Sequence, residues 1–268
     1  MANGIRIHYW RTNTTGKPVM ILLHGSGDYG LSWANLAKNF ADRYDVIMYD
    51  ARGHGYTDPP PVSDSVDAMM EDLAELIREL KIQKPIIMGH SMGSITAAQF
   101  GARYPDVPRA VILADPASLG SDSFWDAAPP ADGEPPLPAA TSRARIASTV
   151  SQNNQTVEEL TSRCLKSLPK WERSDCEFKA VGMRLQHPNT RLTQVGPYLP
   201  LRDLLPRIKA PTLILKADAE GNRRARNEEV AALLPNGKIV HIAGAGHYVH
   251  IDNRQRVIEV MREFLAGI

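Results

Sequence analysis

The pentapeptide Gly89-His90-Ser91-Met92-Gly93 constrains the fold more than any other part of the chain. It directly follows the apolar run 85–88 and precedes residues 94–100, which have the pattern of a helix. This order predicts a sharp corner between a strand and a helix, with Ser91 at its tip. Such a corner requires glycine on both sides, because larger side chains would clash there. The strained turn would hold the Ser91 hydroxyl above the sheet, with the helix start beneath any negative charge that forms.

The rest of the chain alternates short apolar runs with amphipathic stretches, a pattern typical of a mostly parallel sheet covered by helices. The clearest helical patterns span residues 66–80 and 254–266. The expected strands are residues 5–10, 19–23, 46–49, 85–88, 110–114, 212–216 and 238–242.

This alternation stops between about residues 118 and 206. The proline-rich segment 128–138 cannot form a helix or a central strand, because proline lacks a backbone donor and fixes its own dihedral angle. Short helical patterns follow it at residues 142–150, 156–168 and 176–185. We therefore expect a core domain of residues 1–117 and 206–268, with a helical lid inserted at 118–205.

Composition narrows the range of partners. The chain has 268 residues and a formal net charge of +1 without a basic stripe, so we expect a small-molecule substrate rather than nucleic acid or a membrane surface. No apolar stretch approaches the roughly 18 to 20 residues of a membrane span, and the N-terminus lacks a signal-peptide pattern. These features predict a cytoplasmic protein.

The cysteines and histidines give no sign of a metal or cofactor. Cys164 and Cys176 are the only cysteines, and in a cytoplasmic protein we expect both to be reduced thiols. No group of cysteine and histidine residues has the spacing of a metal site.

A serine hydroxyl needs a base to take its proton, and His247 is the best candidate. It ends the glycine-rich loop 243–247, between the last expected strand and the last helix. His250 is a weaker choice. His90 adjoins Ser91, but the turn should point it away from the hydroxyl, so we expect a structural role for it.

A tetrahedral intermediate also needs hydrogen-bond donors for its oxyanion. One should be the backbone N–H of Met92, at the start of the helix. The other should come from the loop His24-Gly25-Ser26-Gly27, where glycines allow close approach and the N–H of Ser26 is the expected donor.

Four motifs together closely resemble the α/β-hydrolase superfamily over residues 1–117 and 206–268. They are His24-Gly25, Asp50-Ala51-Arg52-Gly53-His54-Gly55, the pentapeptide around Ser91, and Gly244-Ala245-Gly246-His247. The resemblance implies an eight-stranded, mostly parallel sheet with helices on both faces. It also implies a nucleophile elbow at Ser91, a base at His247, and a structural turn that contains Arg52 and His54.

The same resemblance leaves the triad acid open. In most members the carboxylate follows the seventh strand, where the family pattern puts Glu220 on the catalytic position and Asp218 on a structural one. Some members take the acid from the end of the sixth strand, which here is Asp115. We favour Glu220 over Asp115, with Asp218 third.

A serine nucleophile points to acyl transfer, whereas epoxide or haloalkane hydrolysis would call for a nucleophilic carboxylate. We expect hydrolysis of a carboxylic ester or lactone of a small to medium, largely apolar substrate. Trp125 and Trp171 of the lid are candidate substrate-binding residues. The alternatives are a lactonase acting on an acyl-homoserine or enol lactone, a C–C bond hydrolase of a diketone, and a ligand-binding protein without catalysis.

Overall fold

The computed structural model describes residues 1–13, 16–116, 119, 139–191, 194–195 and 199–268. Its main sheet has seven strands among these residues, in the order β1-β3-β2-β5-β6-β8-β9. All neighbours run parallel except β1, which is antiparallel to β3. The strands are β1 (Tyr9–Arg11), β2 (Val19–Leu23), β3 (Asp45–Tyr49), β5 (Ile86–His90), β6 (Ala110–Ala114), β8 (Thr212–Ala217) and β9 (Gly237–Ile242).

The expected fold class is confirmed, with seven strands in the described part of the main sheet where eight were expected. The run 5–10 forms a strand only from Tyr9 onward. The central strands are buried on both faces, so their side chains alternate between two apolar layers. Ile21 and Leu23 belong to one layer, whereas Met20 and Leu22 belong to the other.

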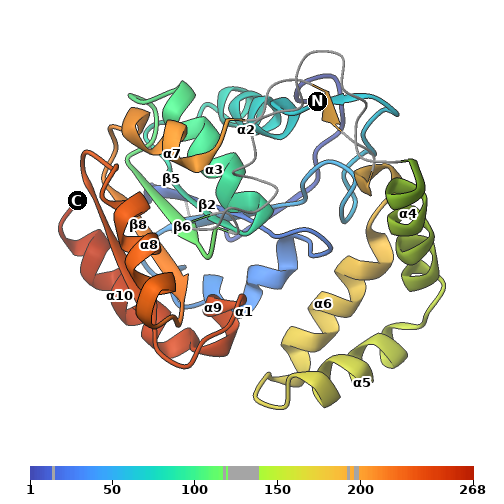
Figure 1. Ribbon diagram of the computed structural model, residues 1–268. Coiled ribbons are helices and arrows are strands. Elements are labelled where there is room, and N and C mark those ends of the chain that lie inside the picture. The colour runs from blue at the N-terminus through green and yellow to red at the C-terminus, as the bar shows by residue number, and fades with distance from the viewer. Residues whose placement is uncertain (14–15, 117–118, 120–138, 192–193, 196–198) are drawn as a thin grey trace.

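Helices cover both faces of the sheet, as Figure 1 shows. The side chain of Asn253 caps one of them, α10, by accepting the N–H of Arg256. One face carries α2 (Ala68–Glu79), α3 (Met92–Arg103) and α7 (Leu201–Leu204). The other carries α1 (Ala34–Ala37), α9 (Val249–Asp252) and α10 (Arg254–Ala266). The helix α8 (Gly221–Ala231) connects β8 to β9.

Three helices between β6 and β8 stand apart from these layers, and we call them the cap helices (Figure 1). They are α4 (Ala139–Asn153), α5 (Val157–Ser167) and α6 (Arg173–Leu185). Thr156 starts α5 with a capping box, in which it and Glu159 satisfy each other's backbone N–H groups. A short 3₁₀ helix, η2 (Pro188–Arg191), follows α6, and β7 (Gln194–Val195) then pairs with β4 (Asp64–Ser65).

The expectation of two reduced thiols is wrong. Cys164 on α5 and Cys176 on α6 form a disulfide, with their Cα atoms 5.6 Å apart. Their sequence separation of 12 carries no sign of this pairing, which arises because α5 and α6 pack side by side. Disulfides are typical of oxidising compartments, so the bond gives no support to a cytoplasmic location. In the described part of the chain no helix is long and apolar enough to cross a membrane.

Candidate active site

Ser91 lies alone between the end of β5 and the start of α3, with φ +51° and ψ −113°. This strained backbone is held in place because the Ser91 N–H donates to the carbonyl of Ala114, 3.1 Å away on the next strand. A Cβ atom at Gly89 would lie 2.0 Å from the carbonyl oxygen of Gly93, and one at Gly93 would lie 2.3 Å from that of Leu23. The corner therefore admits only glycine at these two positions.

The two expected oxyanion donors lie on neighbouring loops at one edge of the sheet. Since β2 pairs with β5, the loop after β2 emerges beside the serine corner. Asp28 N–H donates to the carbonyl of Gly25, 3.1 Å away, and the turn leaves Ser26 exposed. Met92 is the first residue of α3, so its N–H has no acceptor within the helix.

His247 contacts Asp115. The Nδ1 atom of His247 lies 2.5 Å from Oδ2 of Asp115, which follows β6 directly. A carboxylate accepts hydrogen bonds, so Nδ1 carries the proton and donates it. Nε2 of this tautomer is then free to take a proton from another group.

The Asp115 carboxylate is buried and strongly held. Its Oδ1 atom lies 2.7 Å from Nζ of Lys216 and accepts the N–H of Ala217 at 3.0 Å. Burial alone would raise the pKa of Asp115. The hydrogen bond from His247, the charge and hydrogen bond of Lys216 and the N–H of Ala217 outweigh it and lower the pKa to about 2. The carboxylate is therefore ionised at neutral pH.

The structure brings Asp115, and not the preferred Glu220, into contact with the imidazole. Glu220 is exposed just before α8 and makes no hydrogen bond to His247. Asp218 is also exposed, and its Oδ2 accepts the N–H of Gly244 at 2.8 Å, which ties the turn after β9 to the end of β8. Asp115 alone of the three carboxylates meets the imidazole.

Two further histidines lie beneath His247. His90 is 1% exposed, and its Nε2 lies 2.9 Å from the carbonyl oxygen of His247, to which it donates. Burial, followed by the nearby His247, lowers the pKa of His90 to about 4, so its ring is neutral. His250 is buried and its ring lies 4.2 Å from that of Trp33. Both rings support the loop that carries His247.

Ser91 and His247 are brought to the same edge of the sheet without a hydrogen bond between them. His90, the residue before Ser91, donates to the backbone carbonyl of His247. Ala114, the residue before Asp115, accepts the backbone N–H of Ser91. The hydrogen bond between a nucleophile and its base is often long in the absence of substrate and shortens when substrate binds. The arrangement is thus a serine on a strained corner beside a histidine–carboxylate pair.

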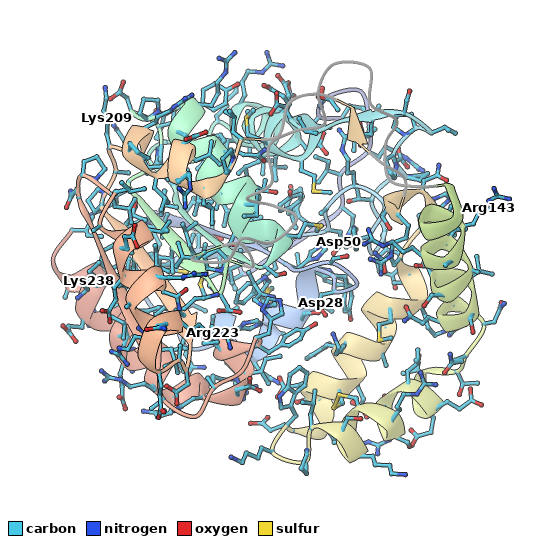
Figure 2. All side chains as sticks on the ribbon, in the orientation of Figure 1. Asp28, Asp50, Arg143, Lys209, Arg223 and Lys238 are labelled. Carbon is cyan, nitrogen blue, oxygen red and sulfur yellow. A yellow bond between two sulfur atoms is a disulfide. The ribbon has the colours of Figure 1, made fainter. Side chains whose placement is uncertain are left out.

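The cap helices meet the core beside His247. Trp171 is 5% exposed, its indole N–H donates to Oδ1 of Asp252 at 2.7 Å, and its ring lies edge-on to Tyr248. Lys179 of α6 contacts the Tyr248 hydroxyl and lies 3.4 Å from Oδ1 of Asp28. Figure 2 shows Asp28 on the side of the core that faces α6. Trp171 therefore joins the cap to the core, and Trp125 lies outside the described residues.

Three polar residues around this site were not expected from the sequence. Lys216 holds Asp115, and Gln186 and Arg191 reach from the cap to Ser26. No motif marks any of them. A lysine near the end of a mostly apolar strand was the one available signal. Arg52, expected to be structural, forms ion pairs with Asp64 and Asp72.

In the described residues no group of three or more His, Cys, Asp or Glu could hold a metal ion.

The sheet order and the strand-to-helix corner define the class of this molecule as an α/β hydrolase. The sequence profile of the alpha/beta hydrolase fold matches residues 18–254, so the chain belongs to this family.

Individual relatives differ in how much of the chain they match. Epoxide hydrolase 1 of Caenorhabditis elegans is 34% identical over 105 residues, 38% of this chain and 26% of that protein. The chain covers 26%, 32% and 31% of three epoxide hydrolases that it matches. The 2-(acetamidomethylene)succinate hydrolase of Mesorhizobium japonicum is 25% identical over 257 residues, 92% of this chain and 88% of that protein. The solved N-formylmaleamic acid deformylase of Pseudomonas putida S16 shares the fold, with a TM-score of 0.72, 22% identity and 97% coverage of each chain.

Proposed function

We propose that this protein is a serine hydrolase that cleaves a carboxylic ester or lactone through an acyl-enzyme on Ser91. The observation that carries the proposal is the 2.5 Å contact between His247 Nδ1 and Asp115 Oδ2 beside the strained Ser91 corner. A serine, a histidine and a buried carboxylate are the groups that nucleophilic acyl transfer uses.

In this mechanism the Ser91 hydroxyl attacks the substrate carbonyl while His247 Nε2 takes its proton. The N–H groups of Ser26 and Met92 stabilise the oxyanion, aided by the start of α3. His247 then gives the proton to the leaving alcohol, and an acyl-enzyme remains on Ser91. Water activated by His247 releases the acid. Asp115 stays ionised throughout and stabilises the imidazolium.

The substrate in this proposal is small to medium in size and lies under a lid formed by residues 118–205. Trp125 and Trp171 remain candidates for its walls. Trp171 borders Tyr248, the residue next to His247, which supports a position close to the reacting atoms. A lactone would react by the same steps, because ring opening also proceeds through an acyl-enzyme.

A second candidate is hydrolysis of an amide-type bond at the same serine. The alignment with a 2-(acetamidomethylene)succinate hydrolase over 92% of this chain favours it. The two candidates differ only in the leaving group that His247 protonates, an amine rather than an alcohol.

The proposal is tested with 4-nitrophenyl butyrate, using Ser91→Ala and the control Ser162→Ala. Ser162 is exposed on α5 and bonds only to Glu158 of its own helix, so its loss should leave turnover unchanged. We expect Ser91→Ala to lose roughly 1,000-fold or more in kcat/KM. A fluorophosphonate should label Ser91 alone, as seen by peptide mass spectrometry. Wild-type turnover in Ser91→Ala, or labelling of another residue, would show that the mechanism is wrong.

A further inference from the structure

The region between the cap and the core holds a cation that has no anionic partner among the residues that the structure describes. Arg191 ends η2, and its guanidinium reaches three neutral oxygens. Nε donates to Thr149 Oγ1 at 3.0 Å, Nη2 to Gln186 Oε1 at 3.1 Å, and Nη1 to Ser26 Oγ at 3.4 Å. No carboxylate among the described residues pairs with it.

Other buried arginines of this chain are each matched by two carboxylates. The side chain of Arg52 is 5% exposed and pairs with Asp64 and Asp72. That of Arg254 is 15% exposed and pairs with Glu172 and Asp175. Arg191 is partly buried with no such partner. Over the described part of the chain, the guanidinium of Arg191 at the contact between cap and core is therefore left without a carboxylate to balance its charge.

The described groups around Arg191 add positive rather than negative charge. Burial lowers the pKa of Arg191, and the charge of Arg145 on α4 lowers it further. His54 is fully buried, and burial together with its neighbours His24 and Arg191 lowers its pKa to about 3, so it is neutral. Neither a second arginine nor a neutral histidine balances the charge of Arg191, so a bound anion would be stabilised there.

Gln186 fixes this guanidinium beside the candidate oxyanion loop. It is fully buried, and its amide N–H₂ group lies 3.2 Å from His54 Nε2, 3.0 Å from Thr190 Oγ1 and 3.4 Å from Ser26 Oγ. His54 Nδ1 donates to the Arg52 carbonyl, so Nε2 is the acceptor for Gln186. The amide and the guanidinium thus converge on the same hydroxyl.

We propose that Arg191 binds a carboxylate of the substrate, which makes the substrate an ester that carries a second, ionised acid group. The inference rests on the proposed hydrolysis at Ser91. A guanidinium has five N–H donors, and the three contacts above leave two for a ligand. The longest of the three contacts is to Ser26, and a carboxylate would replace it with a stronger, charge-assisted bond.

The kinetic test compares 4-nitrophenyl hemiglutarate, which is ionised, with its methyl ester, which is uncharged. We expect the wild type to prefer the ionised ester by about tenfold or more in kcat/KM. Arg191→Gln should lower kcat/KM for the ionised ester by roughly 10- to 100-fold, mainly through KM, and change that for the methyl ester less than about threefold. Arg184→Gln is the control, because Arg184 is an exposed arginine of the same cap.

Two outcomes separate this inference from the proposed function. Equal turnover of both esters, or an equal loss on both in Arg191→Gln, overturns the carboxylate site and leaves ester hydrolysis intact.

Calorimetry with monomethyl glutarate on Ser91→Ala tests binding without turnover. We expect binding that Ser91→Ala/Arg191→Gln weakens about tenfold or more. If this holds while the wild type hydrolyses neither ester, the site stands and the proposed reaction is wrong. No binding overturns the inference.

Discussion

Lys216 Nζ lies 2.7 Å from Oδ1 of Asp115, while Oδ2 of the same carboxylate accepts the Nδ1–H of His247. The side chains of Lys216 and Asp115 are 5% and 6% exposed. Lys216 also donates to the carbonyl of Pro116 at 3.0 Å, and the next N–H of β8, that of Ala217, binds Asp115 Oδ1. The end of β8 thus holds in place the carboxylate that contacts the imidazole.

The first prediction concerns the choice of acid. Asp115→Asn should lower kcat/KM on 4-nitrophenyl butyrate by roughly 1,000- to 10,000-fold, because an amide can hold the imidazole in the wrong tautomer and cannot stabilise its cation. Glu220→Gln should change it less than about threefold, since Glu220 is exposed and does not contact His247. Circular dichroism checks that both variants are folded. A severe loss in Glu220→Gln with a mild one in Asp115→Asn would restore our original preference.

The second prediction concerns stability. Lys216→Met removes one partner of a buried ion pair and should lower the free energy of unfolding by about 3 kcal/mol in urea titrations at pH 7. Lys238→Met on the neighbouring strand β9 is the matched control. The Lys238 side chain is 46% exposed and lies 3.6 Å from Glu263, so its loss should cost less than about 0.5 kcal/mol. Equal effects in the two variants would mean that the buried pair does not stabilise the fold.

The third prediction is the pH dependence of this contribution. The pKa of Asp115 falls from 3.8 to about 2 on folding, so the ionised group stabilises the folded state above pH 3.8, and this contribution is lost as the pH falls through 2. At pH 7 it amounts to about 2 kcal/mol. The difference in unfolding free energy between wild type and Asp115→Asn should therefore shrink by about 1 kcal/mol between pH 7 and pH 3. A difference independent of pH would contradict the depressed pKa.

Local chemistry explains which features could be predicted from the sequence. The Ser91 corner depends on Gly89 and Gly93, whose missing side chains leave room for backbone atoms within a few residues or on the adjacent strand. The strands could be predicted because each is a short run of apolar residues, a pattern that is visible within a few neighbouring positions. The glycine-rich loop around His247 is also visible in the sequence, and the role of His247 as the base stays a prediction. These features therefore leave a mark in the local sequence, although the glycine at position 93 also answers a contact with Leu23 on β2.

The features that could not be predicted depend on contacts between distant segments. Asp115 and Glu220 both follow strands of the sheet, and only the approach of Lys216 across the β6–β8 pair shows which is held against His247. No sequence pattern marks Arg191, because what distinguishes it is that no carboxylate of the described residues pairs with its guanidinium. The Cys164–Cys176 bond likewise depends on how α5 packs against α6.

The final prediction tests that bond. Closing a loop between cysteines 12 residues apart restricts the unfolded chain and should stabilise the protein by about 2 to 3 kcal/mol. Cys164→Ala/Cys176→Ala should therefore unfold at lower urea concentration than the wild type. A reductant should shift the urea midpoint of the wild type to that of the double variant and leave the double variant unchanged, which separates loss of the bond from loss of packing.

Protein purified without reductant should show no alkylation by iodoacetamide in denaturant, since both cysteines are in the disulfide. Two alkylated cysteines would mean that the protein carries free thiols, as its sequence first suggested.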